Sequence, residues 1–367
     1  MLPDCRADVR VLLDKRAFAG RQLGFPRAWG FVTQTVWGKL CRRTQLSIVL
    51  QTRLGSLTLA NPVMSASGTF GAGLEGQQFT DLSGLGALVS KTVTVVPWHG
   101  NPPPRIAETP CGMLNSIGLE NRGADYFLAE TMPRMLEIGP PVIANIGGES
   151  IDDFVNLAER FSAAGAAALE VNLSCPNVQG GRLLFSTNPV MTEAAMRRVK
   201  EVATVPVFAK LSPNVTNIAE MASAAEAGGA DGISAINTLI GMAVDWRQGR
   251  PVLGRTIGGL SGPAIRPVAL RMVYQIRQVT DLPILGIGGA RNAEDVLEFL
   301  AAGADAVQIG TANFGDPGLM PRILADLEIL LTEQGMSVAQ VARSLHRGDS
   351  SGRGGKEAPR GQGVNES

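Results

Sequence analysis

Short apolar segments alternate with amphipathic segments along most of the chain. Apolar, β-branched runs of five to seven residues occur at 62–66, 87–93, 141–146, 167–173, 205–211, 231–237, 282–286 and 304–310. Amphipathic stretches lie between several of them, at 151–164, 193–202, 218–227, 267–279 and 293–302. Apolar runs followed by helical patterns are typical of parallel βα units. Eight such units in one domain-sized stretch predict a (β/α)8 TIM barrel of the α/β class rather than an open sheet.

Glycine positions support this reading. The segments AGAA, GGADG and AGADA follow amphipathic stretches, and their glycines predict left-handed helix ends before the next strand. One connection is irregular, because roughly 45 residues separate the second predicted strand from the third. An excursion of that length at the end of a barrel strand is usually an active-site loop.

The two ends of the chain differ from its centre. Residues 1–46 carry nine Lys/Arg and three Asp/Glu, with Trp29 and Trp37 among them and no clear period. This extension is either the result of a start codon placed too far upstream or a real appendage that docks on a partner or a membrane surface. The first alternative requires a start codon other than that for methionine, because no methionine lies between Met1 and Met64. Residues 347–367 are rich in Gly, Ser and charge and are predicted to be disordered. The barrel is therefore expected at 47–340.

Composition narrows the class of protein. Apolar residues make up 45% of the 367 residues, yet no apolar run is long enough to cross a bilayer. Lys+Arg and Asp+Glu balance at 33 each, so we expect neither nucleic acid nor a membrane as partner. The four cysteines are widely spaced, which argues against a metal or iron–sulfur site in this chain and favours a reducing cytoplasm. They are Cys5, Cys41, Cys111 and Cys175.

Polar residues mark the ends of the predicted strands, where TIM barrels carry their working groups. In chain order these are Ser67-Gly68, Lys91-Thr92, Asn145, Asn172 with Cys175, Lys210, Asn237-Thr238, Gly288-Gly289 and Gly310-Thr311. The last two pairs belong to GIGGA and GTANF, after the seventh and eighth strands. Glycine turns beside helix N-termini at these strand ends predict a site for a phosphate-bearing ligand.

Three side chains are candidates for chemistry. Lys91 and Lys210 are either solvated strand ends or a cation pair that binds a carboxylate and stabilises negative charge on a reduced flavin. Cys175 is either a structural thiol or a general base on the catalytic rim. Only two histidines occur in the chain, and a thiol with a pKa of about 8.5 can accept a proton, so we favour the base.

Taken together, the motifs resemble class 1 dihydroorotate dehydrogenases, most of all the NAD-linked class 1B catalytic subunit, over about residues 46 to 336. The motifs that carry the resemblance are NPVMSASGTFG, SKTVT, NPPPRIAETPCGMLNSIGLEN, ANIGG, EVNLSCPN, AKLSPN, INTLIGM, GGLSGPAIRPVALRMV and GIGGARNAEDVLEFLAAGADAVQIGTANF. The class 2 enzymes, which reduce quinone, have serine in place of the cysteine of SCPN.

The resemblance implies one FMN per chain and oxidation of (S)-dihydroorotate to orotate in de novo pyrimidine biosynthesis. It assigns to FMN the residues Ser67, Lys91, Thr92, Asn145, Asn172, Lys210, Ile236, Gly262, Gly288, Gly289, Gly310 and Thr311. It assigns to the substrate Lys91, Asn115, Ser116, Ile117, Gly118, Leu119, Asn172, Asn237 and Thr238. Cys175 is implied as the base that removes the C5 proton while hydride leaves C6 for flavin N5.

The resemblance also implies a partner. Class 1B enzymes pass electrons to NAD through a second subunit with FAD and a [2Fe–2S] cluster, in a heterotetramer of two of each. Two alternatives remain: a class 1A homodimer that reduces fumarate, and a barrel that binds a phosphorylated ligand for chemistry without redox. Two features depart from the family pattern, namely Cys111 where glycine is expected and the basic extension 1–46.

Overall fold

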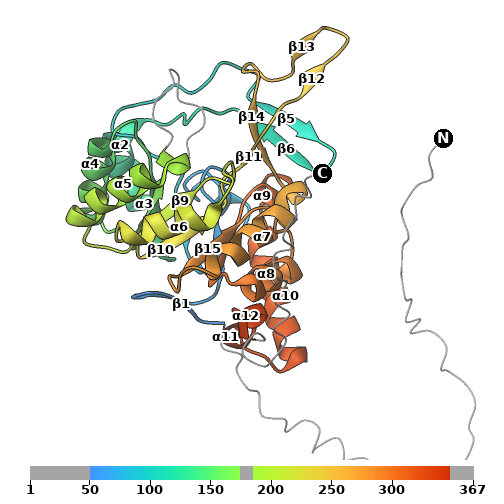
Figure 1. Cartoon of the computed structure of the whole chain (residues 1–367). Coiled ribbons are helices and arrows are strands. Elements are labelled where there is room, and N and C mark those ends of the chain that lie inside the picture. The colour runs from blue at the N-terminus through green and yellow to red at the C-terminus, as the bar shows by residue number, and fades with distance from the viewer. Residues whose placement is uncertain (1–49, 174–184, 348–367) are drawn as a thin grey trace, which may run out of the picture. The chain divides into compact units, whose positions relative to one another are not determined.

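The computed structural model describes residues 50–173 and 185–347, and within them it forms a closed (β/α)8 barrel (Figure 1). The eight strands pair in the order β3-β16-β15-β10-β9-β8-β7-β4, all in parallel. A parallel bridge between Met64 and Ala87 joins the two ends of this sheet. The strands are β3 Val63–Ser65, β4 Leu88–Val89, β7 Val142–Ile146, β8 Ala168–Asn172, β9 Val207–Leu211, β10 Gly232–Ala235, β15 Ile284–Ile287 and β16 Ala306–Ile309. Each lies inside, or within one residue of, a predicted apolar run, so the predicted fold is confirmed.

Helices cover the outside of the barrel, and the amphipathic patterns located five of them. These are α4 Ile151–Ala163, α5 Pro189–Val202, α6 Ile218–Ala227, α7 Arg266–Arg277 and α8 Ala293–Ala302. The second βα unit has α2 Gly123–Tyr126, a π-helical turn η2 Phe127–Thr131 and α3 Met132–Leu136, and the eighth has α9 Ala312–Gly315 and α10 Leu319–Gln334. The remaining pieces are η1 Gly76–Gln78, η3 Phe185–Thr187, η4 Pro263–Ile265, α11 Val338–Val341 and α12 Ser344–Arg347.

Local side chains explain where several helices begin and end. Asn188, Asn217 and Asn292 each accept a backbone N–H bond at the start of α5, α6 and α8, which satisfies a donor that the helix itself leaves unpaired. One glycine in each of the three segments described above takes positive φ, with values of 90° at Gly165, 87° at Gly229 and 121° at Gly303. The predicted left-handed turns are thus present.

An aspartate follows two of these turns and ties each helix end to a neighbouring strand. The Oδ2 atom of Asp231 accepts from the backbone N–H that opens β9, at 2.7 Å. Asp305 does the same for Ile284 at the start of β15, at 2.9 Å. Asp305 also accepts from Arg277 at 2.9 Å and from Arg343 at 3.1 Å. The segment GAD therefore ends a helix and also joins that helix end to the start of a neighbouring strand, at the N-terminal end of the barrel.

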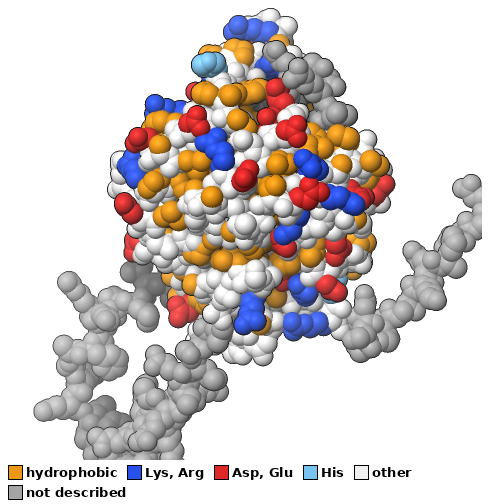
Figure 2. Space-filling model, turned by 90° about the vertical axis from the view of Figure 1, so that its left-hand side faces the viewer, with side chains coloured by type: hydrophobic (Ala, Val, Ile, Leu, Met, Phe, Trp, Pro, Cys, Tyr) orange, Lys and Arg blue, Asp and Glu red, His pale blue; other side chains and the backbone are white. Residues whose placement is uncertain are grey.

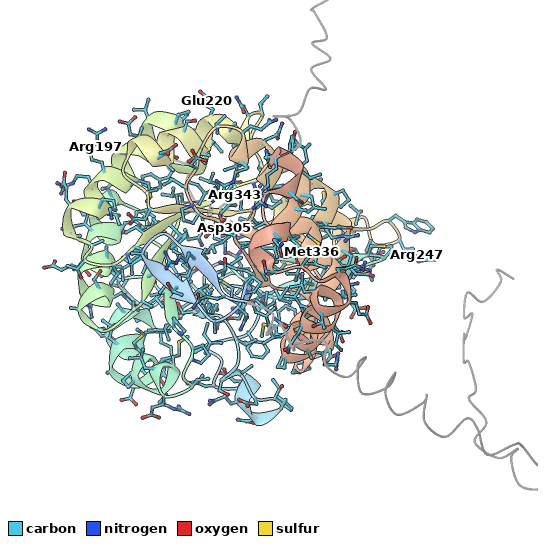
Figure 3. All side chains as sticks on the ribbon, turned by 90° about the horizontal axis from the view of Figure 1, so that it is seen from below. Arg197, Glu220, Arg247, Asp305, Met336 and Arg343 are labelled. Atoms are coloured by element: carbon cyan, nitrogen blue, oxygen red, sulfur yellow. The ribbon has the colours of Figure 1, made fainter. Side chains whose placement is uncertain are left out.

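A hairpin closes the N-terminal end of the barrel. It consists of β1 Thr52–Leu54 and β2 Leu57–Leu59, and it lies across the lower end in the view from below (Figure 3). Leu54 and Leu59 are fully buried and pack with Met64, Phe208 and other side chains of the lower barrel layer. Apolar contact, rather than solvent, therefore fills this end.

A second sheet lies at the opposite end of the barrel. Its four antiparallel strands follow the order β11-β14-β6-β5, with bounds β5 Ile106–Thr109, β6 Gly112–Asn115, β11 Leu239–Gly241 and β14 Gly258–Ser261. The first two belong to the predicted long loop after the second strand. The other two belong to an insertion after β10 that the sequence did not reveal, and this insertion also carries the small pair β12 Val244–Asp245 and β13 Arg250–Pro251. We call residues 239–258 the arm.

The described surface is mixed in charge. On the face shown in Figure 2, basic and acidic side chains are scattered among apolar ones. The arm is different, because it exposes a series of large apolar side chains, namely Ile240, Met242, Val244, Trp246, Val252 and Ile257. No helix within residues 50–173 and 185–347 is both long and apolar enough to span a lipid bilayer. The extension 1–46 and residues 348–367 lie outside the described residues.

Candidate active site

A cavity of about 410 Å³ lies between the C-terminal ends of the barrel strands and the second sheet. Seven of the eight strands or the residues just after them contribute to its lining. Most of the residues assigned from the sequence meet there: Ser67, Lys91, Thr92, Asn115, Ile117, Gly118, Leu119, Asn172, Lys210, Ile236, Asn237, Thr238, Gly262, Gly288, Gly289, Gly310 and Thr311. Side chains separated by more than 200 residues in sequence are thus brought into one site.

Two assigned residues lie behind the cavity wall. Ser116 is fully buried, and its Oγ accepts from Asn101 Nδ2 at 3.0 Å, so its side chain supports the loop instead of lining the cavity. Asn145 is also fully buried, and its Nδ2 donates to Glu170 at 2.6 Å. Its Oδ1 has no hydrogen-bond partner among the described residues.

The second sheet forms the roof of the cavity. Asn115 on β6 donates to the carbonyl of Gly259 on β14 at 3.3 Å, and Thr311 donates to Ser261 on the same strand at 2.8 Å. The roof thereby connects the predicted substrate loop with the predicted phosphate turn. Sequence reasoning did not single out the other lining residues, most of which are apolar or come from the unrecognised insertion: Ala66, Thr69, Ile106, Met113, Glu120, Gly259, Ser261, Ile265, Ile287 and Phe314.

Lys91 is held by the segment that follows β6, and an ion pair ties that segment to the one that precedes β5. Its Nζ donates to the backbone carbonyl of Glu120, and the Glu120 carboxylate forms an ion pair with Arg105. Burial lowers the pKa of Lys91 below its usual range; the charge of Glu120 opposes this shift and that of Arg105 adds to it. Arg105 also donates to the carbonyl of His99 at 3.2 Å. These contacts fix a cation at the edge of the cavity.

The amide side chains near the strand ends are oriented by specific contacts. Asn172 Nδ2 donates to Thr92 Oγ1 at 3.1 Å, which joins the ends of two strands. Asn237 Oδ1 accepts from the backbone N–H of Thr238 at 2.8 Å. Asn214 Nδ2 in turn donates to the carbonyl of Thr238 at 3.0 Å. These amides are therefore pre-positioned to recognise a planar polar ligand.

A buried ion pair forms the floor of the cavity. Lys210 donates to Glu170 at 3.1 Å, and Glu170 has no exposed surface. Burial by itself would raise the pKa of Glu170, but the charge of Lys210 and the polar side chains of Ser234, Gln308 and Lys210 outweigh it and hold that pKa below its usual range. Sequence reasoning did not single out Glu170. The available signal was its place two positions before Asn172, on the same face of an apolar strand.

The glycine turns line the other part of the cavity. Gly289 has φ of 83°, and a Cβ there would lie 2.7 Å from the carbonyl oxygen of Gly262, so the backbone path requires glycine. Gly310 differs, because a Cβ would make an ordinary contact of 3.5 Å with Ala66. A side chain at 310 would therefore fit the protein but occupy space at the cavity wall.

The residues present fit FMN. Cations and oriented amides suit the electron-rich end of a flavin ring, and glycine turns leave room for a phosphate next to main-chain N–H groups. The orphaned Oδ1 of Asn145 lies in the layer directly behind the Lys210 side of the cavity. FMN would be held by the strand-end residues named above.

Cys175 lies outside the described residues, between Leu173 and Phe185. Its assignment as base stays a prediction. Cys111 is described, as an exposed free thiol in the turn between β5 and β6. Its carbonyl accepts from Ala264 at 2.9 Å, so its backbone takes part in the roof.

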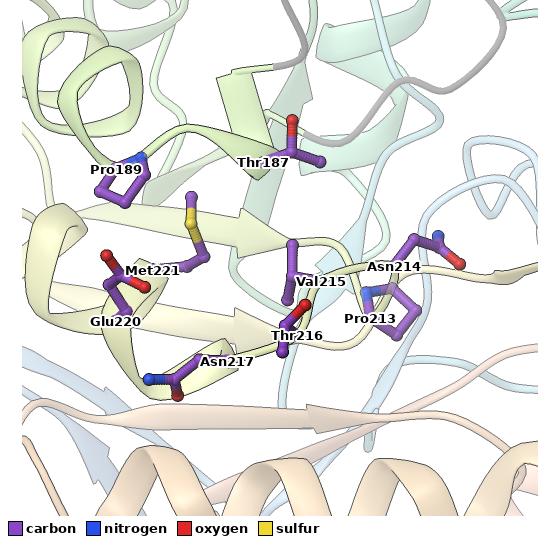
Figure 4. A pocket seen from close by; sticks show the side chains of 9 residues that line it. All are labelled: Thr187, Pro189, Pro213, Asn214, Val215, Thr216, Asn217, Glu220 and Met221. Atoms are coloured by element: carbon purple, nitrogen blue, oxygen red, sulfur yellow. The ribbon is translucent and has the colours of Figure 1, made fainter.

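A second hollow, of about 630 Å³, lies farther out on the rim (Figure 4). It is lined by the start of α5, the loop after β9 and the start of α6, namely by Thr187, Pro189, Pro213, Asn214, Val215, Thr216, Asn217, Glu220 and Met221. Its lining contains neither a cation nor a glycine turn. We place the chemistry in the cavity beneath the second sheet, because that is where the strand-end groups converge.

Comparison with known proteins gives one consistent family. A family model described as dihydroorotate dehydrogenase matches residues 49–331. The dihydroorotate dehydrogenase B (NAD(+)) catalytic subunit of Anoxybacillus flavithermus is 53% identical over 287 residues, covering 78% of this chain and 92% of the relative. The subunit of the same name from Desulforudis audaxviator is 51% identical over 296 residues, covering 80% and 96%. That from Geobacillus sp. WCH70 is 50% identical over 305 residues, covering 82% and 97%.

Proposed function

Because the chain belongs to the dihydroorotate dehydrogenase family, in class 1B, we propose that it oxidises (S)-dihydroorotate to orotate in de novo pyrimidine biosynthesis. The proposed cofactor is FMN, one per chain, in the cavity at the C-terminal end of the barrel. When bound, FMN would accept the hydride that leaves C6 of the substrate. The observation that carries the proposal is the convergence of Lys91, Lys210 and the glycine turns on a single cavity.

Different residues of the chain would bind the cofactor phosphate, orient the substrate and accept the proton. The glycine turns at 288–289 and 310–311 would receive the phosphate of FMN, and the amides of Asn172 and Asn237 would orient the substrate. Lys91, at the edge of the roof, would face the substrate carboxylate or the flavin ring. Cys175 would take the C5 proton as its thiolate, so that proton and hydride leave adjacent carbons.

We also propose an electron-transfer partner and a cytoplasmic location. Electrons would leave for NAD through a second subunit that carries FAD and a [2Fe–2S] cluster, in a heterotetramer of two of each. The wide spacing of the four cysteines in the sequence supports placing the cluster in the partner. The balanced charge and spaced cysteines support a cytoplasmic protein.

One purification tests the central proposal. The purified chain should show a flavin spectrum near one FMN per chain, and dihydroorotate should bleach it anaerobically. A colourless protein that binds another phosphorylated compound would favour the non-redox barrel. Flavin reduction by dihydroorotate followed by rapid reoxidation with fumarate would favour the class 1A alternative.

A further inference from the structure

A buried ion pair lies at the floor of the cavity, and its carboxylate accepts hydrogen bonds from three side chains. Glu170 on β8 and Lys210 on β9 lie on neighbouring parallel strands, and Lys210 is opposite Asn172 in the register. Lys210 Nζ lies 3.1 Å from Glu170 Oε1. Glu170 is 0% exposed and Lys210 is 5% exposed, so neither charge is solvated by bulk water. Lys210 also lines the cavity, and the pair therefore connects the barrel interior with the site.

Two amides hold the carboxylate from other strands. Asn145 Nδ2 on β7 donates to Oε1 at 2.6 Å, and Gln308 Nε2 on β16 donates to Oε2 at 2.6 Å. With Lys210, all three neighbours donate, which is the arrangement an ionised carboxylate requires because it can only accept. The oxygens Asn145 Oδ1 and Gln308 Oε1 have no hydrogen-bond partner among the described residues. Both amides thus use their donors on Glu170.

Among the described residues, Glu170 is the carboxylate that forms an ion pair with Lys210. Ser234 on β10 lies opposite Lys210 in the register, and Asn145 on β7 and Gln308 on β16 donate to Glu170; all three are neutral. Lys91, the other cation of the cavity, is at its edge, where Glu120 and Arg105 are its charged neighbours. A buried ammonium without a counter-charge readily loses its proton, since burial disfavours the charged form.

We propose that Glu170 is a positioning residue that keeps Lys210 protonated and directed at the cavity. The amides of Asn145 and Gln308 fix the carboxylate, and the carboxylate fixes the lysine. Lys210 can then present a full positive charge to a ligand in the cavity. The consequence for a bound flavin rests on the proposed function, whereas the pair itself does not.

The first test follows unfolding rather than activity. Glu170→Gln keeps the shape of the side chain and removes its charge, so its folded state should release the Lys210 proton at a lower pH than the unfolded chain does. The unfolded state then binds more protons, and stability rises with pH. The unfolding constant of the full chain in urea should fall with pH by up to about tenfold per unit between pH 7 and pH 10, a steeper dependence than in the parent at matched flavin content.

Two double variants keep the test specific. Glu170→Gln with Lys210→Met removes the titrating group and should abolish the extra slope. Glu170→Gln with Gln308→Glu returns a carboxylate to the same hydrogen-bonded pair and should move the slope back toward the parent. Equal slopes in Glu170→Gln and the parent, or an extra slope that survives Lys210→Met, would overturn the proposal.

A second measurement reaches the cofactor. With FMN bound, the midpoint potential of Glu170→Gln should fall more steeply with pH than that of the parent, because the neutral lysine no longer stabilises added negative charge. Parallel dependences in the two proteins would also refute the role of Glu170. If the parent holds no FMN, the proposed function fails, yet the unfolding slopes still decide whether Glu170 controls Lys210.

Discussion

Lys91 and Lys210 enter the same cavity from different strands and depend on different partners. Lys91 is held by a backbone carbonyl in a loop, and Lys210 by a carboxylate in the barrel. Both lysines were predictable, because they end apolar runs. Glu120 and Glu170 were not singled out, since the alternation along β8 places Glu170 on the face of Asn172 but reveals no partner on the next strand, and the loop of Glu120 has no period. The same reason explains why Ser116, within a predicted substrate segment, supports the loop from behind.

Cys175 gives the most direct prediction at this scale. Cys175→Ala should slow flavin reduction by dihydroorotate by roughly 10²–10⁴-fold, the usual worth of a positioned base, while FMN content stays unchanged. In the parent the rate should rise with pH as a group of pKa about 8.5 loses its proton. Cys175→Ser should keep part of the rate with the rise moved to higher pH. Rapid-mixing absorbance at several pH values measures all three.

Cys111→Gly is the matched control for the base. It removes the thiol on the exposed turn of the roof and introduces the residue expected there. Its pH profile should follow that of the parent. If Cys175→Ala were reduced as fast as the parent at pH 7, another group would have to accept the proton, and Lys91 would be the next candidate.

Gly310 allows a clean test of the phosphate turn. Gly310→Leu should weaken FMN binding roughly tenfold or more, a cost of about 1.4 kcal/mol, because the added side chain enters the cavity without striking the protein at its Cβ. Gly315→Leu is the control, since a Cβ there meets nothing within 4 Å. Fluorescence titration with FMN compares the two variants. Equal affinity in both would remove Gly310 from the binding site.

At the level of elements, periodicity located the barrel and failed for the roof. The barrel strands are buried on both faces and therefore appear as apolar runs, and α6 and α8 agree with prediction at both ends. The insertion after β10 has strands of two to four residues rich in glycine, so it shows no alternation. Its pairing depends on β6, which lies far away in sequence. Such an element forms through tertiary contact, which single-sequence patterns do not encode.

The aspartate that ties α8 and β16 to β15 should matter for stability. Asp305→Asn removes the charge that pairs with Arg277 and Arg343 and should lower the free energy of unfolding by roughly 3 kcal/mol, because it leaves a buried guanidinium unpaired. Asp281→Asn is the control. That side chain is fully exposed and approaches Arg343 only to 3.9 Å, so its loss should leave the free energy of unfolding nearly unchanged.

Urea unfolding of the two variants at pH 7 decides the matter. Figure 3 labels Asp305 and Arg343, close together in the view from below. An equal effect of the two substitutions would mean that the ion pairs of Asp305 contribute no more than a surface contact.

At the scale of the whole molecule, the arm is the part of the described surface where exposed large apolar side chains are concentrated. Six large apolar side chains are exposed within residues 239–258, and monomers seldom expose apolar groups in such numbers together. This surface agrees with a chain that works in an assembly.

The electron acceptor tests that view. The isolated chain should oxidise dihydroorotate with an artificial dye but reduce NAD poorly, because its G-x-G-x-x-G segment, at 71–76, leads into the three-residue η1 and not into the helix of a dinucleotide-binding βα unit. Adding the electron-transfer subunit should raise the NAD rate by at least about tenfold. Steady-state assays of the two preparations measure this. Rapid NAD reduction by the chain alone would contradict the class 1B assignment.

The roof has a consequence for the order in which the protein acquires its structure. Gly259 pairs with Asn115 across 144 residues of chain, whereas each βα unit forms mainly from neighbours in sequence. Closing so long a loop costs entropy before its contacts form, so distant pairings tend to form slowly. A chain diluted out of denaturant should therefore regain its helical circular dichroism first and its capacity to bind ligand later. The part of the protein that touches the substrate would be the last to take shape.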